Sequence, residues 1–252
     1  MRHLRHVMIV LVLCLLGMAG GALAQLRDLP TLNRPRNEGR PIRFGIAVGL
    51  NVMDFRVLSS GHINELQPFR DTLRYYVSNT RIHPGFNVNA LMRLRITDDM
   101  HIRFLPGICF GQRDLYFYRV QHGGRMGEED IVMPIESSYI EMPILFAYSA
   151  RRTNNARPYV VAGLNVRADM GAFKKLKIEN NQLLRLEKFD LAYEVGFGYE
   201  FYFRYFKMAP ELKWSGGVLN ALSPDAAEGA EWYRDAIKSL RSNVVVFSLI
   251  FE

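Results

Sequence analysis

The segment from Phe189 to Phe203 constrains the fold most, because two kinds of side chain alternate along it. Every second residue from Leu191 is apolar or aromatic, and the intervening set contains Glu194, Glu200 and two glycines. A period of two places these sets on opposite faces of a β-strand, whereas a helical period of 3.6 would mix them. A broad aromatic face opposite a small polar face favours a transmembrane wall, with lipid outside and a narrow polar lumen inside.

Seven other segments show the same alternation of apolar with small or polar side chains. They cover residues 43–54, 83–96, 101–111, 138–149, 159–169, 206–214 and 243–252. Pro106 interrupts the third strand in chain order. Because proline cannot donate a ladder hydrogen bond, a β-bulge is expected at this position.

The connections between these segments alternate between long and short along the chain. The short ones are Thr97–Met100, Ala150–Ala156 and Arg204–Tyr205. An antiparallel barrel in an outer membrane has short periplasmic turns and long outer loops, which gives this order. The sequence therefore predicts an all-β fold: an eight-stranded antiparallel transmembrane β-barrel over residues 42–252, with both mature termini in the periplasm.

Residues 1–24 have the parts of a secretory signal peptide: a basic start, an apolar run over Val7–Leu16 and a small-x-small cleavage site at Ala22-Leu23-Ala24. The apolar run is too short to span a bilayer as a helix. Residues 25–41 contain three prolines and no periodicity, so a flexible periplasmic segment is expected there. The expected location of the mature chain is the outer membrane.

The inward-facing positions of the predicted strands carry charges of both signs. Eight strands leave an interior only wide enough for side chains, and charges in such a space must pair. The sequence therefore predicts a filled barrel rather than a diffusion pore, with a polar network in the lumen formed by Arg93, Arg95, Arg103, Glu141, Arg167, Glu194, Glu200, Glu211 and Lys213.

The long connection before the last strand contains start signals for a short helix. Ser223 suits an N-cap and Pro224 suits the first helical position, so a helix is predicted over Pro224–Ser239 in an outer loop. Its residues Trp232, Tyr233 and Ile237 form a possible docking surface for a partner. Packing of this helix over the barrel mouth is the alternative, and the sequence does not decide between them.

Catalytic, cofactor and metal sites are not predicted. No serine or aspartate accompanies the histidines of the mature chain in a recognisable catalytic spacing. Glu194 and Glu200 lie roughly 20 Å apart at the rise of a strand, too far for a glycosidase pair. Cys109 has no second cysteine in the mature chain and is expected to fill space in the lumen.

The formal net charge of +7 does not indicate nucleic-acid binding, because the basic residues are scattered and form no run. The partner expected from these residues is outer-membrane lipid, with no small-molecule substrate and no nucleic acid.

Several strands resemble the PorT family of outer-membrane barrels from gliding and protease-exporting bacteria. The residues that carry the resemblance are Tyr139-Ile140-Glu141-Met142-Pro143-Ile144, Arg157-Pro158-Tyr159 with Ala162-Gly163, Pro210-Glu211-Leu212-Lys213 before Ser215-Gly216, and the terminal Phe247–Glu252. The resemblance implies an accessory component of the type IX secretion system, which exports folded proteases and adhesins through a different, larger barrel. A small filled barrel would then assist assembly, stability or maturation of this machinery, with other secretion-system proteins as its partners. The resemblance implies no catalytic residues.

Two other functions remain open at this stage. A stand-alone structural or adhesive barrel would also have long loops exposed to the surroundings. A lipid-modifying outer-membrane enzyme is disfavoured, because such an enzyme needs a nucleophile beside a base.

Overall fold

The computed structural model describes residues 33, 39–59, 74–78, 83–120, 126–173, 184–226 and 237–252. The predicted signal peptide and almost all of the segment before Pro41 lie outside these residues. In the described part, no helix is long and apolar enough to cross a membrane.

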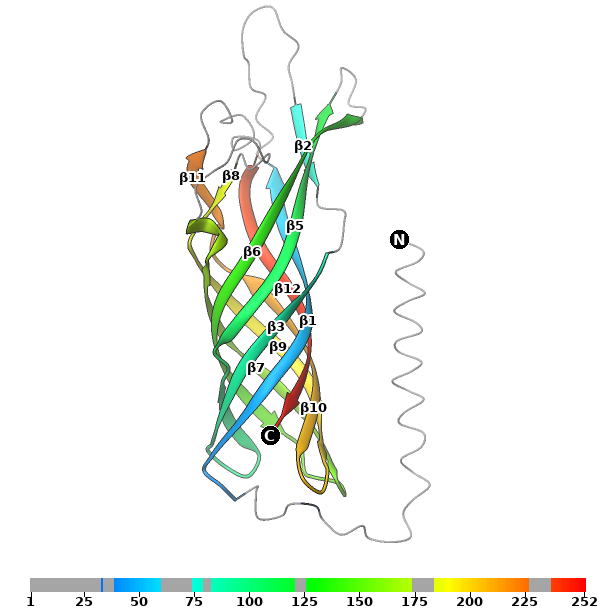
Figure 1. The fold of residues 1–252 in the computed structure, drawn as a ribbon, viewed down its shortest axis with the longest axis vertical. Helices are drawn as coiled ribbons and strands as arrows, with labels where there is room; N and C mark the ends of the chain where they lie inside the picture. The colour runs from blue at the N-terminus through cyan, green and yellow to red at the C-terminus, as the bar shows by residue number, and fades with distance from the viewer. Residues whose placement is uncertain are drawn as a thin grey trace, which may run out of the picture.

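The fold is a tall antiparallel barrel whose strands wind around one axis (Figure 1). The strands are β1 (Ile42–Ser59), β2 (Arg74–Ser78), β3 (Pro84–Arg95), β4 (Met100–Phe104), β5 (Gly107–Val120), β6 (Met126–Ser149), β7 (Ala156–Asp169), β8 (Leu184–Leu186), β9 (Phe189–Tyr202), β10 (Lys207–Gly217), β11 (Leu222–Ala226) and β12 (Ile237–Phe251), with a short 3-10 helix η3 (Gly171–Phe173). The turns β3–β4, β6–β7 and β9–β10 lie at one end, here called the turn end, and the opposite end is called the loop end (Figure 1).

The ring closes because β1 pairs with β12 on one side and with β3 on the other. Around the ring the order is β1, β12, β10, β9, β7, β6, then β4 with β5, and β3. β4 and β5 together occupy one position, since β3 and β6 each pair with both. The eight positions confirm the predicted eight-stranded antiparallel barrel. Closure of the ring leaves no strand edge whose backbone N–H and C=O groups would be unpaired in lipid.

The predicted bulge at Pro106 is wrong. β4 ends before this residue and β5 begins after it, yet the pairing with β3 keeps one register, since Met92 faces Phe104 and Asn89 faces Gly107. Backbone bonds bridge the interruption: the Ala90 N–H donates to the Pro106 carbonyl oxygen at 2.9 Å. Proline therefore breaks the strand without inserting a residue into the ladder.

An apolar band surrounds the half of the barrel nearer the turn end. On β6 its outward side chains run from Ile140 to Tyr148, all exposed. Nine residues that rise about 3.3 Å each and tilt by about 40° span roughly 23 Å, close to the height of a membrane barrel's lipid-facing band. On β1 the band ends after Val52, and the next two outward positions are the exposed Asp54 and Arg56.

Beyond the band, towards the loop end, the pattern inverts, and the apolar side chains point inward. A buried cluster there is formed by Phe55, Leu115, Phe117, Met133, Ala172, Leu186, Ala221, Ile237 and Leu240. Polar outside and apolar inside is the arrangement of a water-exposed barrel. The strands therefore continue past the membrane band as an extension with its own core.

The predicted helix over Pro224–Ser239 is wrong where the structure describes it. Ser223 and Pro224 lie in β11, which pairs with β8. Ile237 opens β12 and pairs with Ser59 of β1. The extension of β12 uses Ile237 for the loop-end core, so tertiary packing overrides the local capping signals. Trp232 and Tyr233 lie outside the described residues, so docking by these two stays a prediction, whereas Ile237 is buried and does not form part of an exposed surface.

Candidate functional site

Two ion pairs cross the barrel interior from wall to wall near the turn end. Arg93 Nη1 on β3 lies 2.6 Å from Glu200 Oε1 on β9, and Arg103 Nη1 on β4 lies 2.7 Å from Glu211 Oε2 on β10. In each pair the two strands are four positions apart in the eight-position ring, so each pair spans the diameter. All four side chains are buried. Side chains therefore close the lumen at this level.

Glu200 lies at the centre of the charges at the turn end. Its carboxylate also accepts hydrogen bonds from Lys207 Nζ at 3.1 Å and from the Tyr202 hydroxyl at 2.9 Å. Glu252 shares two of the same cations: its carboxylate lies 2.6 Å from Arg93 Nη2 and 2.6 Å from Lys207 Nζ. Two carboxylates and two cations thus neutralise each other away from water, as buried charges require.

A second level of polar contacts lies midway along the barrel. Glu194 accepts hydrogen bonds from Asn165 at 2.6 Å and from Lys213 at 3.3 Å. Asn165 also donates to Glu141 at 3.2 Å, and Glu141 accepts a further bond from Asn89 at 2.7 Å. The Asn165 amide on β7 thereby links the carboxylates on β6 and β9, and the Asn89 amide on β3 joins this group through Glu141.

Two arginines mark the upper limit of the polar interior. Arg167 donates to Glu194 at 3.3 Å and also to the Ser215 hydroxyl. Arg113 donates to the Ser242 hydroxyl at 2.7 Å, and its Cζ lies 3.8 Å from the Phe55 ring centroid. Phe55 already belongs to the loop-end core. The lumen therefore changes from polar to apolar at the level of Arg113.

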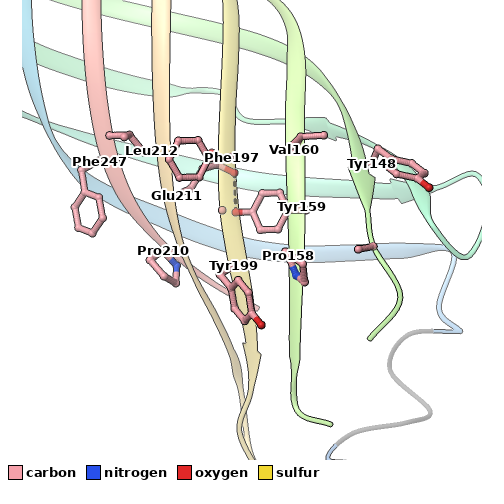
Figure 2. Close-up of a pocket in the computed structure, with 12 residues that line it drawn as sticks. Tyr148, Pro158, Tyr159, Val160, Phe197, Tyr199, Pro210, Glu211, Leu212 and Phe247 are labelled. Carbon is pink, nitrogen blue, oxygen red and sulfur yellow. Dashed lines mark hydrogen bonds between the residues drawn. The ribbon is translucent and has the colours of Figure 1, made fainter. Parts of the chain in front are cut away.

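Gly198 allows a tyrosine to lie flat inside the narrow barrel. Tyr159 faces Gly198 across the β7–β9 ladder, and a Cβ at Gly198 would lie only 2.3 Å from the Tyr159 hydroxyl oxygen. The Tyr159 hydroxyl donates to Glu211 at 2.8 Å (Figure 2), and Arg103 stacks on its ring at 4.2 Å. The missing side chain therefore provides the room for the Arg103–Glu211–Tyr159 contact.

The structure places eight of the nine predicted network residues inside the barrel, and all eight are buried: Arg93, Arg103, Glu141, Arg167, Glu194, Glu200, Glu211 and Lys213. Arg95 is the exception. Its side chain is about one-third exposed at the turn end and pairs with Asp98 of the adjoining turn. As the last residue of β3, Arg95 lies too close to the end of the strand to reach the interior.

Sequence reasoning missed Lys207, Glu252 and Arg113 as members of the network. All three occupy inward positions, and Arg113 lies beyond the predicted third strand on the continued β5. The alternation of Phe206–Trp214 could have identified Lys207. Glu252 and Arg113 lie where strands leave the apolar band. The alternation of lipid-facing residues therefore gives little indication of whether their side chains point into the lumen.

Three further titratable groups of the interior, two histidines and a cysteine, contact side chains of the wall. His101 Nε2 lies 3.1 Å from Arg103 Nε, which donates to it. His83 Nε2 lies 2.7 Å from Asp114 Oδ2, and the Cys109 thiol accepts a hydrogen bond from Asn51 at 3.2 Å. Within the described segments, no group of three or more His, Cys, Asp or Glu side chains could hold a metal ion. The arrangement neutralises charge and closes the lumen.

Comparison with solved structures finds several small barrels. Neisserial surface protein A is 11% identical, with 84% of this chain and 98% of that chain covered and a TM-score of 0.41. Ail of Yersinia pestis, in complex with the heparin analogue sucrose octasulfate, is 10% identical, with 83% and 97% covered and a TM-score of 0.37. OprG from Pseudomonas aeruginosa is 14% identical, with 83% and 90% covered and a TM-score of 0.37.

Comparison with curated protein sequences gives no significant match. A family model, described as the outer membrane protein beta-barrel domain, matches residues 24–222. This match covers more than half of the chain and agrees with the closed ring and its apolar band. The protein belongs to this family of outer-membrane β-barrels.

Proposed function

We propose that this protein is a non-enzymatic, non-conducting accessory component of the type IX secretion system, with its turn end in the periplasm. The observation that carries the proposal is the pair of salt bridges, Arg93–Glu200 and Arg103–Glu211, that cross the full diameter of the lumen. A barrel closed in this way offers no path for folded cargo. Its contribution to secretion would come from its surfaces.

The type IX assignment is supported by the resemblance to the PorT family. Two of the residues that carry this resemblance, Glu141 and Glu211, are buried network members with ordered partners. Because a fold by itself does not define a function, the secretion role needs a cellular test. The proposed orientation follows from the short turns, which lie together at one end of the barrel (Figure 1).

Deletion of the gene is expected to abolish export of proteases that carry the C-terminal type IX targeting domain. Cargo should accumulate in the periplasm, and protease activity in the culture fluid should return when the gene is supplied on a plasmid. The measurement is secreted protease activity together with the periplasmic level of one cargo protein.

The control for this deletion is envelope integrity, measured as sensitivity to a detergent and leakage of a periplasmic enzyme. Lost export with an intact envelope supports the secretion role. Unchanged export would overturn it and leave a stand-alone adhesive barrel, which is then tested by attachment of the deletion strain to surfaces.

The purified protein in a planar bilayer is expected to give no steady conductance above that of the bare membrane. Arg93–Glu200 and Arg103–Glu211 close the turn-end half, and the apolar loop-end core lies beyond them. An open porin in the same bilayer is the positive control. Stable stepwise openings of the folded protein would contradict the closed lumen.

A further inference from the structure

A basic hollow of about 370 Å³ lies at the mouth of the barrel at the turn end. Its lining comes from the start of β1, the β3–β4 and β6–β7 turns, and the adjoining ends of β3, β4 and β7 (Figure 1). The lining contains five arginines and two aspartates, so positive charge is in excess among its described residues. Because these residues lie in the turns or point into the ring of strands, the hollow opens to solvent at the turn end and not to lipid.

Arg157 fixes the two turns that form the rim of the hollow. Its buried side chain donates to the Ala150 carbonyl oxygen of the β6–β7 turn at 2.7 Å. It also donates to the Asp98 carbonyl oxygen at 2.7 Å and to the Asp99 carboxylate at 3.0 Å, both in the β3–β4 turn. One arginine thus ties the two turns together. A ligand would therefore meet a preformed rim and lose little entropy in ordering it.

Two other arginines of the lining keep charge available for a ligand. Arg151 is exposed on the rim, and no described residue is its carboxylate partner. Arg43 Nη1 lies 3.8 Å from Glu252, beyond hydrogen-bond distance, and its buried Nε has no hydrogen-bond partner in the described part of the chain. Glu252 lies only 2.6 Å from both Arg93 and Lys207. Its charge is therefore shared, and Arg43 is only partly neutralised.

The same rim already holds one residue of this chain by its backbone. The Asn33 N–H donates to the Asn155 side-chain oxygen at 2.9 Å, and the Asn33 carbonyl oxygen accepts a hydrogen bond from Arg152 at 2.8 Å. The Asn33 side-chain amide donates to the Tyr202 carbonyl oxygen at 3.0 Å. Arg152 also lines the hollow. The donors and acceptors of this rim therefore suit a polypeptide.

Charge distinguishes between the possible occupants of the hollow. Residues 25–41 of this chain contain four arginines and only two carboxylates, so this segment would add positive charge and not neutralise it. A phosphate offers acceptors only, and the exposed carboxylates of Asp98 and Asp99 on the rim would repel it. A peptide with acidic side chains has carboxylates for the arginines and backbone N–H groups for the aspartates. The mixed lining therefore matches an acidic polypeptide from another molecule.

We propose that this hollow is the docking site for an acidic segment of a periplasmic protein, with carboxylates of the segment at Arg151 and Arg43. Guanidinium groups bind carboxylates through short, charge-assisted hydrogen bonds. The proposal rests on the function proposed above for the location and role of the partner, since a closed barrel would act in secretion through a surface of this kind. Binding itself depends only on the hollow.

The test uses the full-length mature protein in phosphatidylcholine nanodiscs and a fluorescent peptide of alternating glutamate and glycine. Binding is measured by fluorescence anisotropy at physiological ionic strength. The wild type should bind this peptide and should not bind its analogue with glutamine in place of glutamate. Arg151→Glu should weaken binding about tenfold, because it removes one ion pair and places a like charge beside the peptide.

Arg204→Glu is the matched control for this substitution. Arg204 is exposed on the β9–β10 turn at the same end of the barrel but does not line the hollow. Its replacement should change the affinity less than about twofold, because salt screens charges that the peptide does not contact. Heat-modifiable migration on a gel verifies that both variants are folded.

Three results would overturn the proposal: no binding by the wild type, an equal loss in the two variants, or displacement of the peptide by an equal concentration of inorganic phosphate. The last would identify a site for small anions. Each result is distinct from a failure of the secretion role. If deletion abolishes export while the wild type binds no peptide, the secretion role stands and only this docking site is lost.

Discussion

Replacement of Glu200 by glutamine is expected to destabilise the barrel by about 3–5 kcal/mol, because it removes one of the two carboxylates that neutralise a group of buried cations. Arg93 and Lys207 both approach this carboxylate, at 2.6 Å and 3.1 Å, and Glu200 is fully buried. An amide keeps the shape but removes the charge. The expected loss is therefore electrostatic and requires no change in packing volume.

The measurement is equilibrium urea unfolding in vesicles, followed by the heat-modifiable migration of the folded barrel on a gel. The matched control is Glu136→Gln, since Glu136 is exposed on the outer face of β6 and its charge is solvated. That substitution should change the stability by less than about 0.5 kcal/mol. Equal effects of the two substitutions would show that the crossing ion pairs are not what holds the turn end together.

A second substitution tests whether unpaired charge is the cause. Adding Lys207→Met to Glu200→Gln removes one of the uncompensated cations and should recover part of the lost stability. Residues in direct contact are expected to show such non-additive effects. If the two losses instead add, Lys207 is stabilised mainly by Glu252, which lies 2.6 Å from its Nζ.

The fold could be predicted because a strand in a membrane barrel has a simple environment. Lipid on one side and a narrow lumen on the other impose a strict period of two, and Phe189–Phe203 shows it without exception. The same rule assigned Glu194 and Glu200 to the interior. It could not indicate that Arg93 faces Glu200 across the barrel, because this contact depends on the ring order and the stagger of the strands.

The loop end was harder to predict because its strands leave the lipid. Beyond Val52 the outward positions Asp54 and Arg56 are polar, and inward positions such as Phe55 join an apolar core. A search for lipid-facing alternation therefore ends β1 and starts β12 too close to the membrane. The local signals Ser223 and Pro224 favoured a helix, but pairing of β11 with β8 prevails over them.

Replacement of Ile144 by arginine is expected to destabilise the barrel in vesicles by about 2–4 kcal/mol, the cost of a cation on the lipid-facing surface near the bilayer midplane. Ile144 is 58% exposed and lies in the middle of the outward band on β6, between Ile140 and Tyr148. Exposure of this kind would be harmless in water. The cost arises only if the surrounding medium is hydrocarbon.

Leu58→Arg is the matched control, because Leu58 is another exposed aliphatic residue, 54% exposed on the outer face of β1. It lies beyond Asp54 and Arg56, where the outward positions are polar, and the substitution changes the charge by the same amount. Its expected cost is about 0–1 kcal/mol, as near a membrane interface. Urea unfolding of both variants in vesicles measures the difference. A large cost at both positions would move the membrane boundary towards the loop end, and a small cost at both would remove the basis for the band.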